Sequence, residues 1–202
     1  VKVIGAVYKI PLTGLIGGTG RGYFSTAYTL FMPVHAITLG AFPVALSGLV
    51  SKYRATGDSA RVAALQRSAC GLFFWVGLAG TALMVLLAGP YTRLVAGAPK
   101  AVYTVLILAP TALFSAMAAA HRAFAEGHLN MVPTSVCQVL EALFKMVFGL
   151  LFAKLSMGRL YQIYLDTGMV LGNRAESETA ALSMMYPVTA ACAMLGVTLG
   201  AL

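Results

Sequence analysis

The sequence predicts an all-α fold, a polytopic membrane bundle of about six transmembrane helices. Of the 202 residues, 59% are hydrophobic and only 10% are charged, whereas soluble domains carry about 25% charged residues. Several uncharged runs reach the roughly 20 residues that cross the hydrocarbon core of a bilayer, namely 22–51, 68–92, 101–120 and 179–202. Helices are expected because hydrocarbon offers no partner to unpaired backbone groups. The alternative, a set of buried helices from a large soluble protein, would need a more charged surface.

Six spans follow along the chain, with turn signals between them. They are expected at about 1–16, 23–50, 68–88, 101–120, 133–153 and 178–202. The Gly-rich sequence GGTGRG is expected to turn the chain between the first span and the second. Pro33 and Pro43 should bend the second span, because proline removes a backbone hydrogen-bond donor. Before the third span, Asp58 or Ser59 is suited to cap a helix that continues into it.

The later spans are bounded in the same way. The sequence AGPYTRLVAGAPK separates the third span from the fourth, and HRAFAEGHLNMVP separates the fourth from the fifth. Pro133 suits the first turn of the fifth span. A longer polar segment, 154–178, precedes the sixth span and has room for a short helix. The loop 51–67 holds four basic residues and one acid, so we expect it on the cytoplasmic side.

Both ends of the chain lie in apolar sequence. It opens with VKVIGAVYKIPLTGLIGG, which is too short for a complete first span, and it stops at LGVTLGAL. We therefore expect a single domain, 1–202, that forms the N-terminal transmembrane lobe of a longer protein. In this interpretation the first helix is truncated and the second lobe is absent.

Charged residues inside the spans are the main functional signal, because each is costly in lipid and usually faces a bundle interior or a wet cavity. Lys2 and Lys9 are seven residues apart, so they share a helix face and lie about 10 Å apart along the axis. They form either a cationic stripe that lines a cavity for an anionic substrate, or side chains that extend to the membrane interface.

A second polar group lies in the fifth span. Glu141 precedes Lys145 by four residues, the order that favours an ion pair within a helix, and Gln138 extends the same polar face. Two roles stay open for this pair: a self-neutralised structural contact, or a part in ion coupling or substrate gating. His35, alone in an uncharged span, is either a packing residue or a proton switch.

Other classes of function lack their sequence signals. His121, Glu126 and His128 do not have the spacing of a convincing metal site, and no catalytic constellation is present, so neither an enzyme nor a cofactor is expected. The three cysteines are isolated and are interpreted as core residues. The net charge of +8 is dispersed among apolar spans rather than gathered in a basic stripe, which argues against nucleic acid as a partner.

Three blocks of sequence carry a family resemblance. They are KIPLTGLIGGTGRGYFSTAY from residue 9, FPVALSGLVSKY from residue 42, and HRAFAEGHLNMVPTSVCQVLEALFK from residue 121. The chain resembles the polysaccharide-biosynthesis and stage V sporulation protein B family of the multidrug/oligosaccharidyl-lipid/polysaccharide exporter superfamily. The resemblance implies a multi-pass protein of the bacterial plasma (inner) membrane, with two pseudo-symmetric lobes that move substrates by alternating access.

The resemblance also implies a substrate and site residues. It suggests a flippase for lipid-linked oligosaccharides or peptidoglycan precursors, whose diphosphate would be held by Lys2, Lys9 and Arg21. Its partners would be that anionic lipid, the surrounding membrane lipids and the missing C-terminal lobe. A cation-coupled multidrug or metabolite exporter of the same superfamily is the first alternative, and it should carry cavity acids instead of lysines. The second alternative is a non-transporting scaffold for cell-wall enzymes, which should tolerate neutral substitutions.

The segment between the fourth and fifth spans is interpreted as a cytoplasmic gate. Arg122 and Glu126 are four residues apart and are placed to bind each other or the helix ends. Asn130, just before Pro133, is placed to bind free backbone groups. The polar residues expected to gate or to support the structure are therefore Arg122, Glu126, Asn130, Gln138, Glu141 and Lys145. Replacement of Arg122 or Glu126 by Ala should reduce transport without reducing expression.

Overall fold

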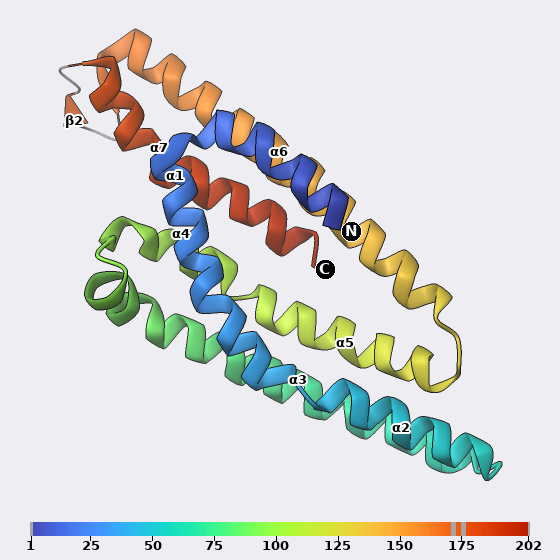
Figure 1. Cartoon of the computed structure of the whole chain (residues 1–202). Helices are drawn as coiled ribbons and strands as arrows, with labels where there is room; N and C mark the ends of the chain where they lie inside the picture. The colour runs from blue at the N-terminus through green and yellow to red at the C-terminus, as the bar shows by residue number, and fades with distance from the viewer. Residues whose placement is uncertain (1, 171–172, 175–176, 202) are drawn as a thin grey trace.

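The computed structural model describes residues 2–170, 173–174 and 177–201, and it forms an elongated bundle of helices (Figure 1). The helices are α1 (Lys2–Leu39), α2 (Phe42–Ala55), α3 (Ser59–Pro90), α4 (Val102–Leu108), α5 (Thr111–Gly127), α6 (Val132–Thr167) and α7 (Glu178–Leu199). A π-helical turn, η1 (Tyr91–Val95), and a 3-10 turn, η2 (Pro99–Ala101), join α3 to α4. Two short strands, β1 (Met169–Val170) and β2 (Asn173–Arg174), pair antiparallel between α6 and α7. The predicted all-α membrane bundle is confirmed.

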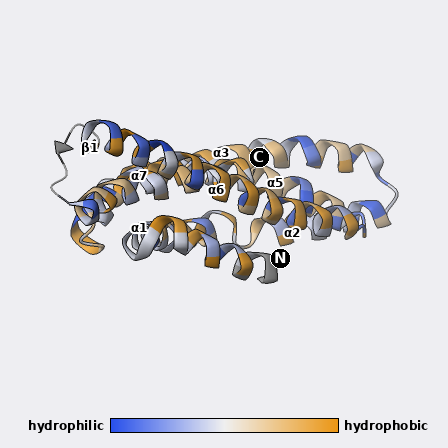
Figure 2. Cartoon of the chain, turned by 90° about the horizontal axis from the view of Figure 1, so that it is seen from above, coloured by the Kyte–Doolittle hydropathy of each residue, from blue (hydrophilic) through white to orange (hydrophobic). Residues whose placement is uncertain are grey.

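The number of spans differs from the prediction. Within the described residues, five stretches are long and apolar enough to cross a membrane: Val7–Ala55, Ser59–Val95, Pro99–Gly127, Val132–Thr167 and Glu178–Leu199. The expectation of six is wrong because the predicted first and second spans belong to one nearly continuous helical stretch. Hydrophilic residues lie mainly toward the two ends of the bundle, and hydrophobic ones dominate along the helices (Figure 2).

A sharp kink at Gly17 shapes the N-terminal part of the bundle. Gly17 has φ 64° and ψ −179°, a conformation that is essentially restricted to glycine. The part of α1 before it, which we call the N-terminal arm (residues 2–16), runs alongside α6, whereas the part after it crosses toward α3 and α2 (Figure 1). The predicted turn is therefore present, but a single residue of GGTGRG makes it, so no separate span results.

The ends of α1, α3 and α6 differ in how closely they follow the sequence signals. The helical path breaks at Gly40–Ala41, just before Pro43 in the first turn of α2. Asp58 caps α3 by accepting a hydrogen bond from the Arg61 N–H at 3.0 Å. The helix that carries the fifth span does not end near residue 153, because α6 continues to Thr167. Its 36 residues correspond to about 54 Å, whereas the hydrocarbon core is about 30 Å thick. The same helix therefore extends beyond the hydrocarbon.

Small and polar residues allow α7 to pack closely in the middle of the bundle. A side chain at Gly196 would meet the backbone of Gly149, so these two glycines let α6 and α7 approach each other. The Thr111 and Thr198 hydroxyls lie 3.0 Å apart, and the Thr198 hydroxyl is also within hydrogen-bond distance of the Ile107 carbonyl at 2.9 Å. These contacts hold α7 against α4, α5 and α6. Another side of α6 packs against α1.

Candidate functional site

A cavity of about 560 Å³ lies among α1, α6 and α7, and we call it the central cavity. Its walls are mainly apolar, but they carry nine polar or charged side chains: Tyr8, Lys9, Thr13, Arg21, Ser25, Tyr28, Gln138, Glu141 and Lys145. Cavities of this size, with a few convergent polar groups, are typical of ligand sites. Its charged lining residues, Lys9, Arg21, Glu141 and Lys145, all belong to candidate membrane spans.

The kink at Gly17 brings two of the predicted substrate residues to one cavity. Lys9 lies on the N-terminal arm and Arg21 on the part of α1 after the kink, and both line the central cavity. Neither has a carboxylate within ion-pair distance in the part of the chain that the structure describes. Lys2 belongs to α1, but its side chain lies outside the described residues, so its predicted role stays a prediction. The two described cations are thus free to bind an external anion.

A three-residue ion-pair network borders the cavity on α6. The Lys145 Nζ atom donates to Glu141 Oε1 at 2.5 Å, and the Arg122 Nη1 atom on α5 donates to Glu141 Oε2 at 3.2 Å. The predicted pair within α6 is therefore present. The three side chains are only 23–27% exposed. Glu141 ties α5 to α6 here.

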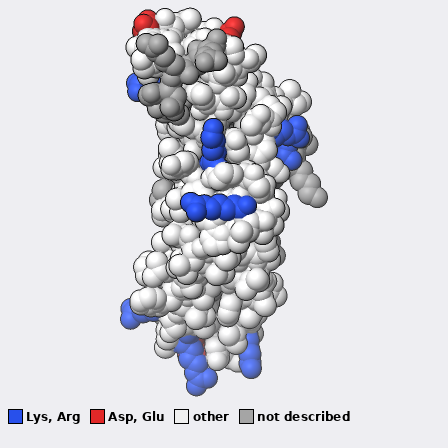
Figure 3. All heavy atoms as spheres, turned by 90° about the vertical axis from the view of Figure 1, so that its left-hand side faces the viewer, with Lys and Arg blue, Asp and Glu red and all other residues white. Residues whose placement is uncertain are grey.

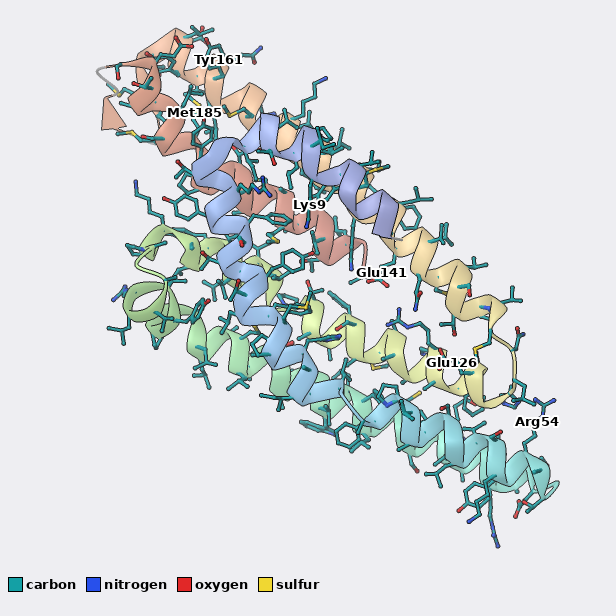
Figure 4. The ribbon with its side chains drawn as sticks, viewed as in Figure 1. Lys9, Arg54, Glu126, Glu141, Tyr161 and Met185 are labelled. Carbon is teal, nitrogen blue, oxygen red and sulfur yellow. The ribbon has the colours of Figure 1, made fainter. Side chains whose placement is uncertain are left out.

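A second cavity of about 340 Å³, which we call the end cavity, lies between the same ion pair and one end of the bundle. Its polar lining is His35, Arg122, Glu126, Thr134 and Gln138. Gln138 lines both cavities, while Arg122 lines the end cavity and Glu141 the central one. The Arg122–Glu141 bridge and Gln138 therefore stand between the two spaces. In Figure 4, Lys9 and Glu141 lie toward the middle of the bundle, and Glu126 and Arg54 lie progressively closer to that end.

The loops at that end are fastened to each other. The Arg54 guanidinium at the end of α2 donates to the His128 carbonyl after α5. The Asn130 side-chain oxygen accepts a hydrogen bond from the Val132 N–H at 3.1 Å, as expected for a residue just before α6. The loops predicted to be cytoplasmic therefore lie at the same end of the bundle, and their side of the membrane stays a prediction.

Arg122 does not pair with Glu126, contrary to one of the two arrangements expected from their spacing. In the described structure its ion-pair partner is Glu141 on α6. The Arg122 side chain lines the end cavity and contacts the carboxylate of Glu141, which Lys145 also holds. A bridge between helices, rather than a contact within α5, is the stronger candidate for a gate.

We expect the two predicted gate residues to differ in effect. Arg122→Ala should reduce transport severalfold, because it removes the bridge between α5 and α6 and leaves Glu141 with one cation. Glu126→Ala should reduce transport less. The measurement is transport by the complete protein in liposomes, normalised to the amount inserted. His121→Ala, at an exposed neighbouring position on α5, is the matched control. If His121→Ala reduced transport as much as Arg122→Ala, the gate role of Arg122 would be contradicted.

Several cavity residues were not singled out in the sequence. Tyr8 and Tyr28 line the central cavity, and Phe24 lies between them with ring centroids at 6.4 Å and 5.2 Å. The Tyr8 hydroxyl is buried without a hydrogen-bond partner among the described groups. The available signals were the position of Tyr8 beside Lys9 and that of Tyr28 seven residues after Arg21. Neither position indicates a shared site until the kink at Gly17 brings the two parts of α1 to the same cavity.

The rest of the charge is distributed without a metal-like cluster. In the described parts of the chain, no three His, Cys, Asp or Glu residues gather closely enough to hold a metal ion, and Cys70, Cys137 and Cys192 are free thiols. On the face shown in Figure 3, isolated Lys and Arg side chains lie on a mostly uncharged surface, and the acidic ones lie near one end.

Comparison with known proteins identifies the family. The polysaccharide biosynthesis protein family matches residues 1–167, which include all of α1–α6 and every cavity residue named above. This chain belongs to that family. The family and the apolar spans make it a multi-pass protein of the bacterial plasma membrane.

Two relatives from Bacillus subtilis (strain 168) are similar to this family member. The lipid II flippase MurJ is 28% identical over 158 residues, which cover 73% of this chain and 28% of that protein. Stage V sporulation protein B is 25% identical over 140 residues, which cover 69% of this chain and 27% of that protein. The chain thus spans less than a third of the length of the two relatives. No solved structure matches it.

Proposed function

We propose that this chain is the N-terminal lobe, 1–202, of a flippase that moves lipid-linked oligosaccharide or peptidoglycan precursors across the bacterial plasma membrane by alternating access. The central cavity carries the proposal: Lys9, Arg21 and Lys145 line a space of about 560 Å³ within the candidate spans. Cations at this depth are costly and are retained for a ligand or pathway. The activity moves a molecule and breaks no covalent bond, so the proposal includes no catalytic residue.

The chemistry of the cavity supports a phosphorylated headgroup. Lysine and arginine side chains form strong, charge-assisted hydrogen bonds with phosphate oxygens. Ser25 and Tyr28 also line the cavity, and their hydroxyl groups are suited to polar groups of an attached sugar. One of the two relatives is a lipid II flippase by name, which agrees with a lipid-linked anion. The remaining lobe of the complete protein would close the cavity on its open side.

Reconstitution of the complete protein tests the proposal directly. Liposomes would be loaded on one side with a fluorescent polyprenyl-diphosphate sugar, and its appearance on the other side would be followed by quenching. We expect protein-dependent movement of this lipid and much slower movement of a matched sugar lipid without the diphosphate. Equal movement of both lipids would reject a diphosphate site. Export of a cationic dye in place of the anionic lipid would support the cation-coupled exporter, and no transport of either would support a scaffold.

A further inference from the structure

Glu141 has a position that the proposed binding of an anion does not explain. Its carboxylate lines the central cavity, where a phosphorylated headgroup would be bound, and it is itself negative. Among the described residues that line this cavity, Glu141 is the only acid, beside the cations Lys9, Arg21 and Lys145. The net lining charge is therefore 3 − 1 = +2 for these residues. An acid at this place weakens the attraction of the cavity for any anion.

The contacts of Glu141 show which cation it restrains. Its Oε1 atom holds the Lys145 Nζ atom at 2.5 Å, and its Oε2 atom holds the Arg122 guanidinium at 3.2 Å. Lys145 lines the central cavity, whereas Arg122 lines the end cavity. Lys9 and Arg21 lack such a partner in the described structure. Of the three cations of the central cavity, Lys145 alone is already bound by an internal anion.

An entering diphosphate must then compete for Lys145. If its oxygens take the ammonium group, two anions share one cation, and they repel each other strongly because water is partly excluded from such a site. If Glu141 keeps Lys145, the diphosphate is held by Lys9 and Arg21 alone. In both cases the affinity is lower than three free cations would give. A transport site needs this limit, since it must release its ligand as well as bind it.

We propose that Glu141 is an internal competitor for the anionic headgroup, which limits its affinity in the central cavity and promotes its release by recapturing Lys145. This inference rests on the proposed function and adds a residue that sets the release of the substrate. Glu141 is a positioning residue here, because it acts on the ligand through Lys145. Through its second contact, to Arg122, Glu141 links the release of the headgroup to the bridge between α5 and α6.

Binding of inorganic diphosphate to the complete protein tests the inference. Calorimetry at low ionic strength would compare the wild type with Glu141→Gln, which keeps the shape of the side chain and removes its charge. We expect roughly tenfold tighter binding from the loss of one unit of repulsion near the ligand, together with slower movement of the fluorescent lipid in liposomes. A purely structural role for Glu141 predicts weaker binding. Unchanged or weaker binding by a folded Glu141→Gln protein would overturn the proposal.

Two further variants keep the test decisive if Glu141→Gln alone does not fold, because the combined variant leaves only Arg122, and not Lys145 as well, without its partner. Lys145→Gln should weaken diphosphate binding, and Glu141→Gln combined with Lys145→Gln should recover it, because the net lining charge returns to +2. A double variant as weak as Lys145→Gln alone would overturn the proposal. Asp166→Asn changes the same charge at an exposed position of α6 and is the control that should bind like the wild type.

The same measurements separate this inference from the proposed function. If the wild type binds no diphosphate, and Lys9→Gln changes nothing, the anion site itself is rejected and the inference falls with it. If Lys9→Gln weakens binding while Glu141→Gln equals the wild type, the anion site stands and only the competitor role is rejected.

Discussion

Neutralising Lys9 or Arg21 is expected to reduce transport of a polyprenyl-diphosphate sugar about tenfold or more, because a hydrogen bond to a charged group contributes about 1.5–3 kcal/mol. Both side chains line the central cavity without an internal carboxylate partner among the described residues. Lys9→Gln and Arg21→Gln each remove one such contact and keep most of the side chain. The double variant should be nearly inactive. The measurement is the initial rate of lipid movement in liposomes, normalised to inserted protein.

Matched controls separate a local effect from a loss of total charge. Lys100→Gln in η2 and Arg93→Gln in η1 change the same residue types at exposed positions outside the cavity. Both should transport like the wild type. If Lys9→Gln and Arg21→Gln behave like these controls, the cavity cations do not bind the substrate, and the anion-binding role is wrong.

Replacing Gly17 is expected to have the largest structural effect of any single substitution in α1. Alanine at φ 64° and ψ −179° is strained by about 1–3 kcal/mol. Its Cβ atom would also lie 2.7 Å from the Cζ atom of Tyr186 on α7, so the Tyr186 ring would have to move. Gly17→Ala should therefore displace the N-terminal arm, separate Lys9 from Arg21 and nearly abolish transport. The midpoint of thermal unfolding in detergent should fall as well.

Gly18→Ala is the natural control for this prediction. Gly18 follows directly in the sequence, has no positive φ and has open space where its Cβ atom would be. Alanine favours helix over glycine by about 1 kcal/mol, so Gly18→Ala should be neutral or slightly stabilising. A Gly17→Ala protein that matches Gly18→Ala in stability and transport would show that the kink does not shape the cavity.

The fold class was predictable from local composition, whereas the exact spans were not. Long uncharged runs in a chain with 10% charged residues are sufficient to predict membrane helices. The merging of the first two spans depends on how many residues of GGTGRG leave the helix, and glycine permits both outcomes. The continuation of α6 to Thr167 was missed because charges at Lys154 and Arg159 were interpreted as the end of a span. Charged residues end the hydrophobic run, but they do not end a helix.

The site was predictable in part, for an equally physical reason. Helical periodicity placed Glu141 beside Lys145, and the ion pair is present. Lys9 was singled out as a charge inside an apolar span, and Arg21 through the family resemblance. No local pattern shows that Lys145 and Glu141 share a cavity with Lys9, because that requires the N-terminal arm to fold back along α6. The partner of Arg122 was missed for the same reason: it lies on another helix.

One measurement tests most directly the central claim, that the cavity cations face a hydrated, positive chamber. In a complete protein in which every cysteine, including Cys70, Cys137 and Cys192, is replaced by Ser, Ser25→Cys would place a single thiol in the central cavity. Its reaction rates with an anionic and a cationic water-soluble thiol reagent would be divided by those of a free thiol in solution. Trp75→Cys, at a position 68% exposed on α3 and outside the cavity, is the control, which we expect to face lipid.

The account predicts that the Ser25→Cys protein reacts, that it prefers the anionic reagent, and that the preference disappears when Lys9→Gln and Arg21→Gln are added. The Trp75→Cys protein should react with neither reagent. A Ser25→Cys thiol that is as unreactive as the Trp75→Cys control, or that prefers the cationic reagent, would contradict the claim.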